Sequence, residues 1–122
     1  MKDFEYITLN TNGVLRDVNA KSSIFKTNRG KIVFLQETHT TEASRRQWEE
    51  TWEPGGRVCF SHGTTSSAGV ATLIPEHIKF ISEHNLMPGR ILLTKIEMND
   101  EILNLVNIYN YTNDNFKKQV TF

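Results

Sequence analysis

Several kinds of residue are scarce in this sequence, and each scarcity excludes a class of protein. The 122 residues include one cysteine, Cys59, so no disulfide can form within the chain, which is typical of a reducing compartment. No apolar run approaches the roughly 20 residues that a membrane-spanning helix needs, and the first ten residues lack the apolar core of a signal peptide. We therefore expect an intracellular protein that does not enter a membrane.

An excess of charge of either sign is also missing. Lysine plus arginine and aspartate plus glutamate both number 14, with nine basic and eight acidic residues in 1–61 and five and six in 62–122. A basic surface is the usual electrostatic mark of a nucleic-acid-binding module, so the composition gives no support for that function. The 38% of hydrophobic residues is enough for the packed core of one domain.

The first half of the chain alternates predicted strands with predicted helices. Side chains of residues 4–10 alternate between two partly buried faces, and residues 32–35 form an apolar run that Gln36 continues. Residues 4–10 and 32–36 are therefore predicted as strands. Asp17 is expected to cap a helix that ends near 28–30, and a second helix is expected over 41–52. This order favours an α/β fold in which neighbouring strands are parallel.

The second half is rich in short β-type runs instead. Asn99-Asp100 predicts a hairpin turn, and the whole half is expected to form an antiparallel meander attached to the same sheet. Near the end, Asn113-Asp114 predicts the cap of a helix that begins at about 116 and is not completed, which favours the front part of a longer domain. The five predicted β-type runs are 57–61, 69–74, 78–82, 91–97 and 101–109.

Polar side chains follow the first two predicted strands. Asn10 and Asn12 come after the first, and Gln36 and Glu37 after the second. The carboxyl ends of parallel neighbours lie side by side, and one carboxylate with amide oxygens suits a hard cation such as Mg²⁺. The alternatives are a solvated or helix-capping Glu37 and an ordinary turn at Asn12-Gly13.

Four motifs in order resemble those of the endonuclease/exonuclease/phosphatase family, and span nearly the whole chain. They are most similar to the endonuclease domain of LINE-type (non-LTR) retrotransposons, relatives of the apurinic/apyrimidinic repair endonucleases. The resemblance implies a DNase I-like four-layer α/β/β/α sandwich, a mixed sheet with flanking helices, of which residues 1–122 would be the N-terminal part. The motifs are LNTNG (9–13), FLQETHT (34–40), SHGTTSSAGVATLI (61–74) and LVNIY (105–109).

The same resemblance implies roles for individual residues. Glu37 would be the carboxylate that binds Mg²⁺ or Mn²⁺, and Asn10 would help to orient the metal or the phosphate. Tyr109 would hydrogen-bond the scissile phosphate, and Asn12 and Asn113 would lie on the phosphate or DNA side. The function implied is that of an N-terminal fragment of a magnesium-dependent DNA endonuclease, acting in the nucleus.

Other features keep alternatives open. The family's later G-D-x-N and S-D-H motifs are not present; Asn113-Asp114-Asn115 and Ser82-Glu83-His84 only imitate parts of them. The chain is therefore alternatively an inactive remnant that binds a metal or a partner at most, or a phosphatase of the same fold. If it holds only the first sheet, some apolar residues of 69–74 and 102–108 are exposed on the face meant for the second sheet, and the isolated chain is expected to be marginally stable or to self-associate through that face.

Overall fold

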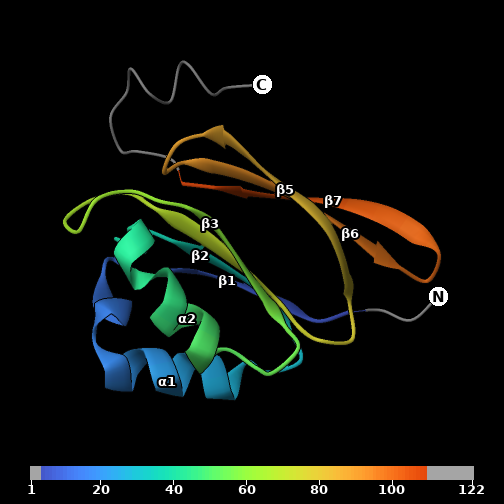
Figure 1. The fold of residues 1–122 in the computed structure, drawn as a ribbon, viewed down its shortest axis with the longest axis horizontal. Helices are drawn as coiled ribbons and strands as arrows, with labels where there is room; N and C mark the ends of the chain where they lie inside the picture. Colours follow the sequence, from blue (N-terminus) through green and yellow to red (C-terminus); the bar gives the residue numbers. More distant parts are fainter. Residues whose placement is uncertain (1–3, 110–122) are drawn as a thin grey trace.

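The computed structural model describes residues 4–109, which form two stacked β-sheets with helices on the outer face of the first (Figure 1). The first sheet has the strand order β1 (Tyr6–Asn10), β2 (Ile32–Gln36), β4 (Val70–Ile74) and β3 (Arg57–Ser61). The second sheet has the order β5 (Lys79–Met87), β6 (Ile91–Met98) and β7 (Glu101–Ile108). The helical segments are η1 (Val14–Arg16), α1 (Val18–Thr27), η2 (Glu42–Ser44) and α2 (Arg45–Thr51).

The mixed character of the first sheet confirms the predicted α/β arrangement. β1 and β2 are parallel neighbours, and Asn10 lies beside Gln36 at their carboxyl ends. β4 runs antiparallel to both β2 and β3, so the sheet is mixed. The limits of β2 and β3 are the predicted ones.

The prediction that the second half extends the same sheet was wrong for its last three strands. β3 and β4 join the first sheet, but β5, β6 and β7 pair only with one another and stack on it. Their inward side chains, including Leu92, Ile96 and Leu105, pack with Ile32 and Val70 of the first sheet. Alternation of apolar and polar residues has the same period in a strand that extends a sheet and in one that stacks on it.

Both faces of β2 and β4 are therefore covered, whereas Tyr6 of the edge strand β1 is 64% exposed. All five residues of β4 are buried, so the expectation that part of 69–74 is exposed was wrong. Some residues of 102–108 are exposed as expected, but on the outer face of the second sheet and not on a face of the first: Ile102, Val106 and Ile108 are 63%, 49% and 40% exposed. Continuous burial explains the apolar runs of β2 and β4, since a strand covered on both faces has no polar side.

The helical layer is held to the first sheet by aromatic side chains. Asp17 caps α1 as predicted, because its side chain accepts a hydrogen bond from the Asn19 amide at 2.9 Å. The helix predicted over 41–52 is a short 3₁₀ turn followed by α2. Phe25 of α1 packs edge-on against Trp48 and against Trp52, with ring centroids 5.4 and 5.7 Å apart.

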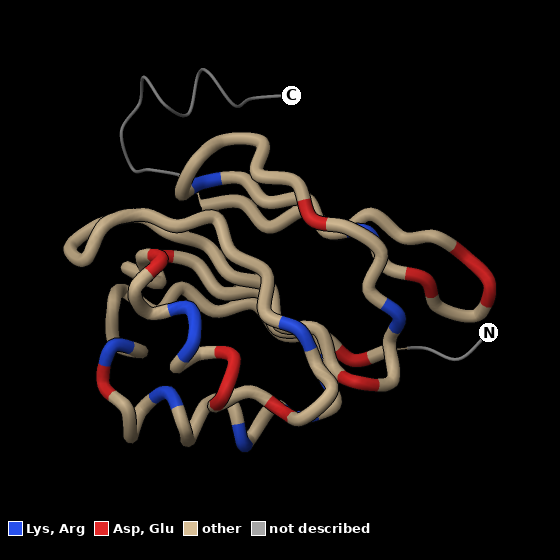
Figure 2. The backbone as a smooth tube through the Cα atoms, viewed as in Figure 1, with Lys and Arg blue, Asp and Glu red and all other residues tan. Residues whose placement is uncertain are grey.

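Charged residues of both signs are spread over the fold. In Figure 2, positive and negative residues are interspersed in the helical layer and lie mainly near the ends and turns of the strands. Among residues 4–109, no helix has the length and apolar composition that would let it cross a membrane. Asn113 and the helix predicted from about 116 lie outside the described residues.

Candidate functional site

The site is at the carboxyl ends of β1 and β2. Beyond the paired Asn10 and Gln36, the two chains stay joined, because the Thr11 amide donates to the Gln36 carbonyl oxygen at 2.8 Å. The Gly13 amide then donates to the Glu37 carbonyl oxygen at 2.7 Å. The polar residues that follow the two strands are thus held at one edge of the sheet.

Glu37 has an unusual backbone conformation. Its φ is 51°, in the left-handed region that residues other than glycine, asparagine and aspartate seldom occupy. The Thr11 hydroxyl adds a second hydrogen bond to the Glu37 carbonyl oxygen, at 3.0 Å, which helps to hold this conformation. Such strained residues concentrate at functional sites, where the surrounding structure maintains them.

The Glu37 carboxylate meets the side chain of Tyr109. The Tyr109 hydroxyl donates a hydrogen bond of 2.7 Å to Glu37 Oε1, although the residues are 72 positions apart. Burial raises the pKa of Tyr109 to about 12, and the hydrogen bond and negative charge of Glu37 act in the same direction. The positive charge of Arg90 opposes this rise in pKa. Tyr109 is therefore a hydrogen-bond donor throughout the physiological pH range.

Two amide side chains connect the sheets beneath this pair. Gln36 Nε2 donates to Asn107 Oδ1 at 2.9 Å and to Thr8 Oγ1 at 3.0 Å. Asn107 in turn donates from Nδ2 to carbonyl oxygens of the first sheet. The sequence analysis assigned no role to Asn107, although it lies inside the LVNIY motif. Its position as a polar residue among the inward-facing residues of a strand could have indicated a structural or functional role.

Asn10 and Asn12 lie together on the exposed side of the strand ends. The Asn12 amide donates to Asn10 Oδ1 at 3.1 Å, a turn that suits the positive φ of 46° at Asn12. The structure therefore brings Glu37 and Tyr109 into direct contact and places Asn10 one pairing position before Glu37. The remaining candidate, Asn113, lies outside the described residues.

Glu37 and Asn10 provide few protein oxygens for a metal ion. Within the described residues 4–109 no group of three or more His, Cys, Asp or Glu could hold a metal. Mg²⁺ keeps several waters and often takes only one or two carboxylates, so Glu37 with the amide oxygen of Asn10 is a compatible donor set. A carboxylate has about four acceptor positions, so the bond from Tyr109 leaves Glu37 able to bind an ion.

The third motif contributes a loop that packs against the segment after Glu37. The Thr38 amide donates to the Gly69 carbonyl oxygen at 3.1 Å, and the His39 amide to the Ala68 carbonyl oxygen at 2.9 Å. Gly69 has a φ of 95°, and a Cβ there would lie 2.5 Å from Thr38 Oγ1. Glycine at this position thus lets the loop approach closely enough to position the site.

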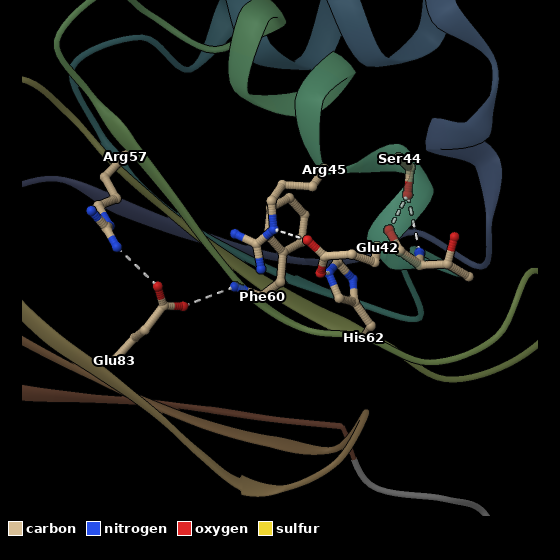
Figure 3. A network of polar contacts seen from close by, with 8 residues as sticks. Glu42, Ser44, Arg45, Arg57, Phe60, His62 and Glu83 are labelled. Atoms are coloured by element: carbon tan, nitrogen blue, oxygen red, sulfur yellow. Dashed lines mark hydrogen bonds and ion pairs between the residues drawn. The ribbon is translucent and has the colours of Figure 1, made fainter.

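A network of charged and aromatic side chains anchors the same segment to β3 (Figure 3). Glu42 forms an ion pair with Arg45 at 2.8 Å, and His62 Nε2 lies 3.1 Å from a Glu42 carboxylate oxygen. The Arg45 guanidinium lies 4.9 Å from the centre of the Phe60 ring, and His62 stacks on the same ring. Burial, together with the charge of Arg45, lowers the pKa of His62, while Glu42 opposes the shift. His62 is therefore part of a structural contact.

A pocket of about 280 Å³ lies between this segment and α1, and His39 is one of its lining residues. It also contains Lys21, which is 1% exposed and donates from Nζ to Gln47 Oε1 at 2.8 Å. Burial lowers the pKa of Lys21. A buried lysine gave no signal in the sequence, because its surroundings come from a different helix.

The two stacked sheets, the helices on one of them and the strand-end carboxylate define a DNase I-like fold. Solved structures with this architecture include an AP endonuclease, LMAP, from Leishmania major (TM-score 0.66, 17% identity) and one from Archaeoglobus fulgidus (TM-score 0.61, 19% identity). Each similarity covers 88% of this chain, but only 40% and 41% of the respective endonuclease. The fold class predicted from the motifs is confirmed.

Among curated proteins, the chain is similar to the transposon TX1 uncharacterized 149 kDa protein of Xenopus laevis. The two are 35% identical over 106 residues, which covers 84% of this chain and 8% of the transposon protein. No family model matches the sequence. The resemblance to the endonuclease/exonuclease/phosphatase family, of retrotransposon type, is confirmed by this relative and by the fold. The chain spans less than half the length of each of these proteins.

Proposed function

We propose that the chain is the N-terminal part of a metal-dependent DNA endonuclease of LINE retrotransposon type, which hydrolyses phosphodiester bonds. The observation that carries the proposal is the 2.7 Å contact between Tyr109 and Glu37 at the strand ends. Tyr109 resembles the family's phosphate-binding tyrosine and Glu37 its metal-binding carboxylate, and the fold brings the two together although they are far apart in the sequence. The similarity to AP endonucleases and to a transposon protein supports DNA as the proposed substrate.

Each residue has a role that its chemistry supports. Glu37 would hold Mg²⁺ or Mn²⁺, with Asn10 as an orienting amide oxygen, and the bound ion would withdraw charge from the phosphoryl oxygens. Tyr109 keeps its proton because its pKa is raised to about 12, so its hydroxyl can donate to a phosphate oxygen as well as to Glu37. Asn12 and Asn113 would contact the phosphate or the DNA. The Arg90 guanidinium, whose charge acts on Tyr109, would favour an anion nearby.

A water nucleophile also needs a base, and the leaving oxygen needs a proton or charge stabilisation. The G-D-x-N and S-D-H motifs that supply these groups in the family are not in the 122 residues. We infer that a longer natural protein supplies them and that the nucleus is where it acts.

The test is nicking of supercoiled plasmid with Mg²⁺ or Mn²⁺ by the 122-residue chain and by a version extended through the downstream gene sequence. We expect the extended protein to nick the plasmid and the 122-residue chain to have no detectable activity. Glu37→Gln should abolish nicking, while Glu101→Gln, which alters an exposed carboxylate on β7, should not. Nicking by the short chain that disappears in Glu37→Gln would show that the downstream groups are dispensable.

The absent motifs also favour a second candidate, an inactive remnant that binds only a metal or a partner. Binding of Mn²⁺ that depends on Glu37, without nicking by the extended protein, would support the remnant. Hydrolysis of small phosphate esters but not of DNA would instead support a phosphatase of the same fold.

A further inference from the structure

Asn107 is a buried polar residue whose side chain connects three strands. It is 1% exposed and lies on the inner face of β7, opposite the first sheet. Its Nδ2 donates to the Ala71 carbonyl oxygen at 2.8 Å and to the Leu35 carbonyl oxygen at 3.2 Å. Its Oδ1 accepts from Gln36 Nε2 at 2.9 Å. Both ends of the amide are therefore satisfied by β2 and β4.

These bonds determine how β7 lies over β2. An apolar side chain in the layer between the sheets can be accommodated at slightly different positions, whereas an amide that must satisfy fixed carbonyl groups permits one register. The network continues across the first sheet, because Gln36 Nε2 also donates to Thr8 Oγ1 of β1. The three strands that end near the site are thus joined by one chain of hydrogen bonds.

The residues of this network are close in sequence to both partners of the Glu37–Tyr109 contact. Gln36 immediately precedes Glu37, and Asn107 lies two residues before Tyr109. Residues two positions apart in an extended chain point to the same face, so a side chain that fixes Asn107 also directs Tyr109 toward the first sheet. A shift of β7 by one residue would turn Tyr109 to the outer face.

We infer that Asn107 is a positioning residue, which sets the register of β7 so that the Tyr109 hydroxyl reaches Glu37. Its importance for phosphodiester hydrolysis rests on the proposed function. The geometric role does not, and it can be tested without any nuclease activity.

The test measures whether the contact between Tyr109 and Glu37 survives when Asn107 is changed. Tyr109→Phe removes the hydroxyl donor, and Glu37→Gln removes the charge of the acceptor. The free energies of urea unfolding of the unaltered chain, the two single variants and the double variant give the coupling between the two side chains. In the unaltered background the effects of the two changes should be non-additive.

Asn107→Ala is expected to abolish this coupling, so that the effects of Tyr109→Phe and Glu37→Gln become additive. The matched control is Asn104→Ala, the same change on the same strand but on the exposed outer face, which should leave the coupling unchanged. A folded Asn107→Ala variant with lower stability but an unaltered coupling would overturn the inference, because Asn107 would then be only structural.

A second variant covers the case in which Asn107→Ala does not fold. Gln36→Met removes the donor to Asn107 Oδ1 while Asn107 keeps its bonds to the first-sheet carbonyl groups. A partial loss of the coupling between Tyr109 and Glu37 is expected, and an unaltered coupling in this folded variant would likewise overturn the inference. Failure of the extended protein to nick DNA would contradict the proposed function and leave these coupling measurements interpretable.

Discussion

The contact between Tyr109 and Glu37 predicts a measurable coupling between the two side chains. Charge-assisted hydrogen bonds are roughly twice as strong as neutral ones, and a neutral bond contributes about 1 kcal/mol to stability. Glu37→Gln retains an acceptor oxygen but removes the charge, and Tyr109→Phe removes the donor. The part of the bond that depends on charge, about 1 kcal/mol, should therefore appear as the interaction free energy of a double-mutant cycle.

Urea unfolding of the four chains at neutral pH, followed by tryptophan fluorescence, provides the free energies of unfolding. Trp48 and Trp52 are both 2% exposed, so unfolding should change their emission. Sites that do not touch usually add within about 0.3–0.5 kcal/mol, so a coupling inside that range would refute the contact. Tyr6→Phe combined with Glu37→Gln is the control, since Tyr6 is at the opposite end of β1 and should be additive.

Three further predictions concern pH, backbone conformation and association. The pKa of Tyr109 is raised to about 12 in the folded chain, so the stability that this residue contributes is fully present below its ordinary pKa of 10.0 and is lost as pH rises through the folded value. Between these two pKa values the melting temperature of Tyr109→Phe should fall less steeply with pH than that of the unaltered chain. Gly13→Ala should lower the free energy of unfolding by about 2–3 kcal/mol, because the backbone has a left-handed φ there and the added Cβ would overlap the His39 imidazole. Gly30→Ala, at a position with a left-handed φ but open space, should lower it by about 1 kcal/mol, and equal losses in urea unfolding would contradict the overlap with His39. The 122-residue chain should self-associate through the outer face of the second sheet, and Val106→Lys should weaken this in sedimentation velocity; a concentration-independent monomer would count against it.

Local patterns in the sequence were sufficient to locate most elements. The apolar run after Gly30 and the one that begins at Arg57 gave the limits of β2 and β3. Asn99-Asp100 forms the predicted hairpin turn, with positive φ at both residues. These features depend on side chains within a few residues of one another, so a linear pattern contains the relevant information.

Sheet membership could not be predicted in the same way. The strands β5, β6 and β7 have the alternation of any half-buried strand, and only packing against Ile32, Val70 and Ile74 shows that they form a second sheet. The fold class was still predicted correctly, because the order of four motifs is a property of the whole chain.

The candidate site was likewise predicted only in part from the sequence. By itself the sequence predicted that Glu37 directly follows a buried strand and that this strand runs parallel to the one that ends at Asn10, since parallel pairing follows from the order of strands and helices. Only the tertiary structure decided that the Glu37 carboxylate binds the Tyr109 hydroxyl and that Asn107 lies buried beneath them. The physical reason is distance along the chain: contacts across 72 residues depend on how two sheets stack, and burial at that interface sets the register of the strands and raises the pKa of Tyr109.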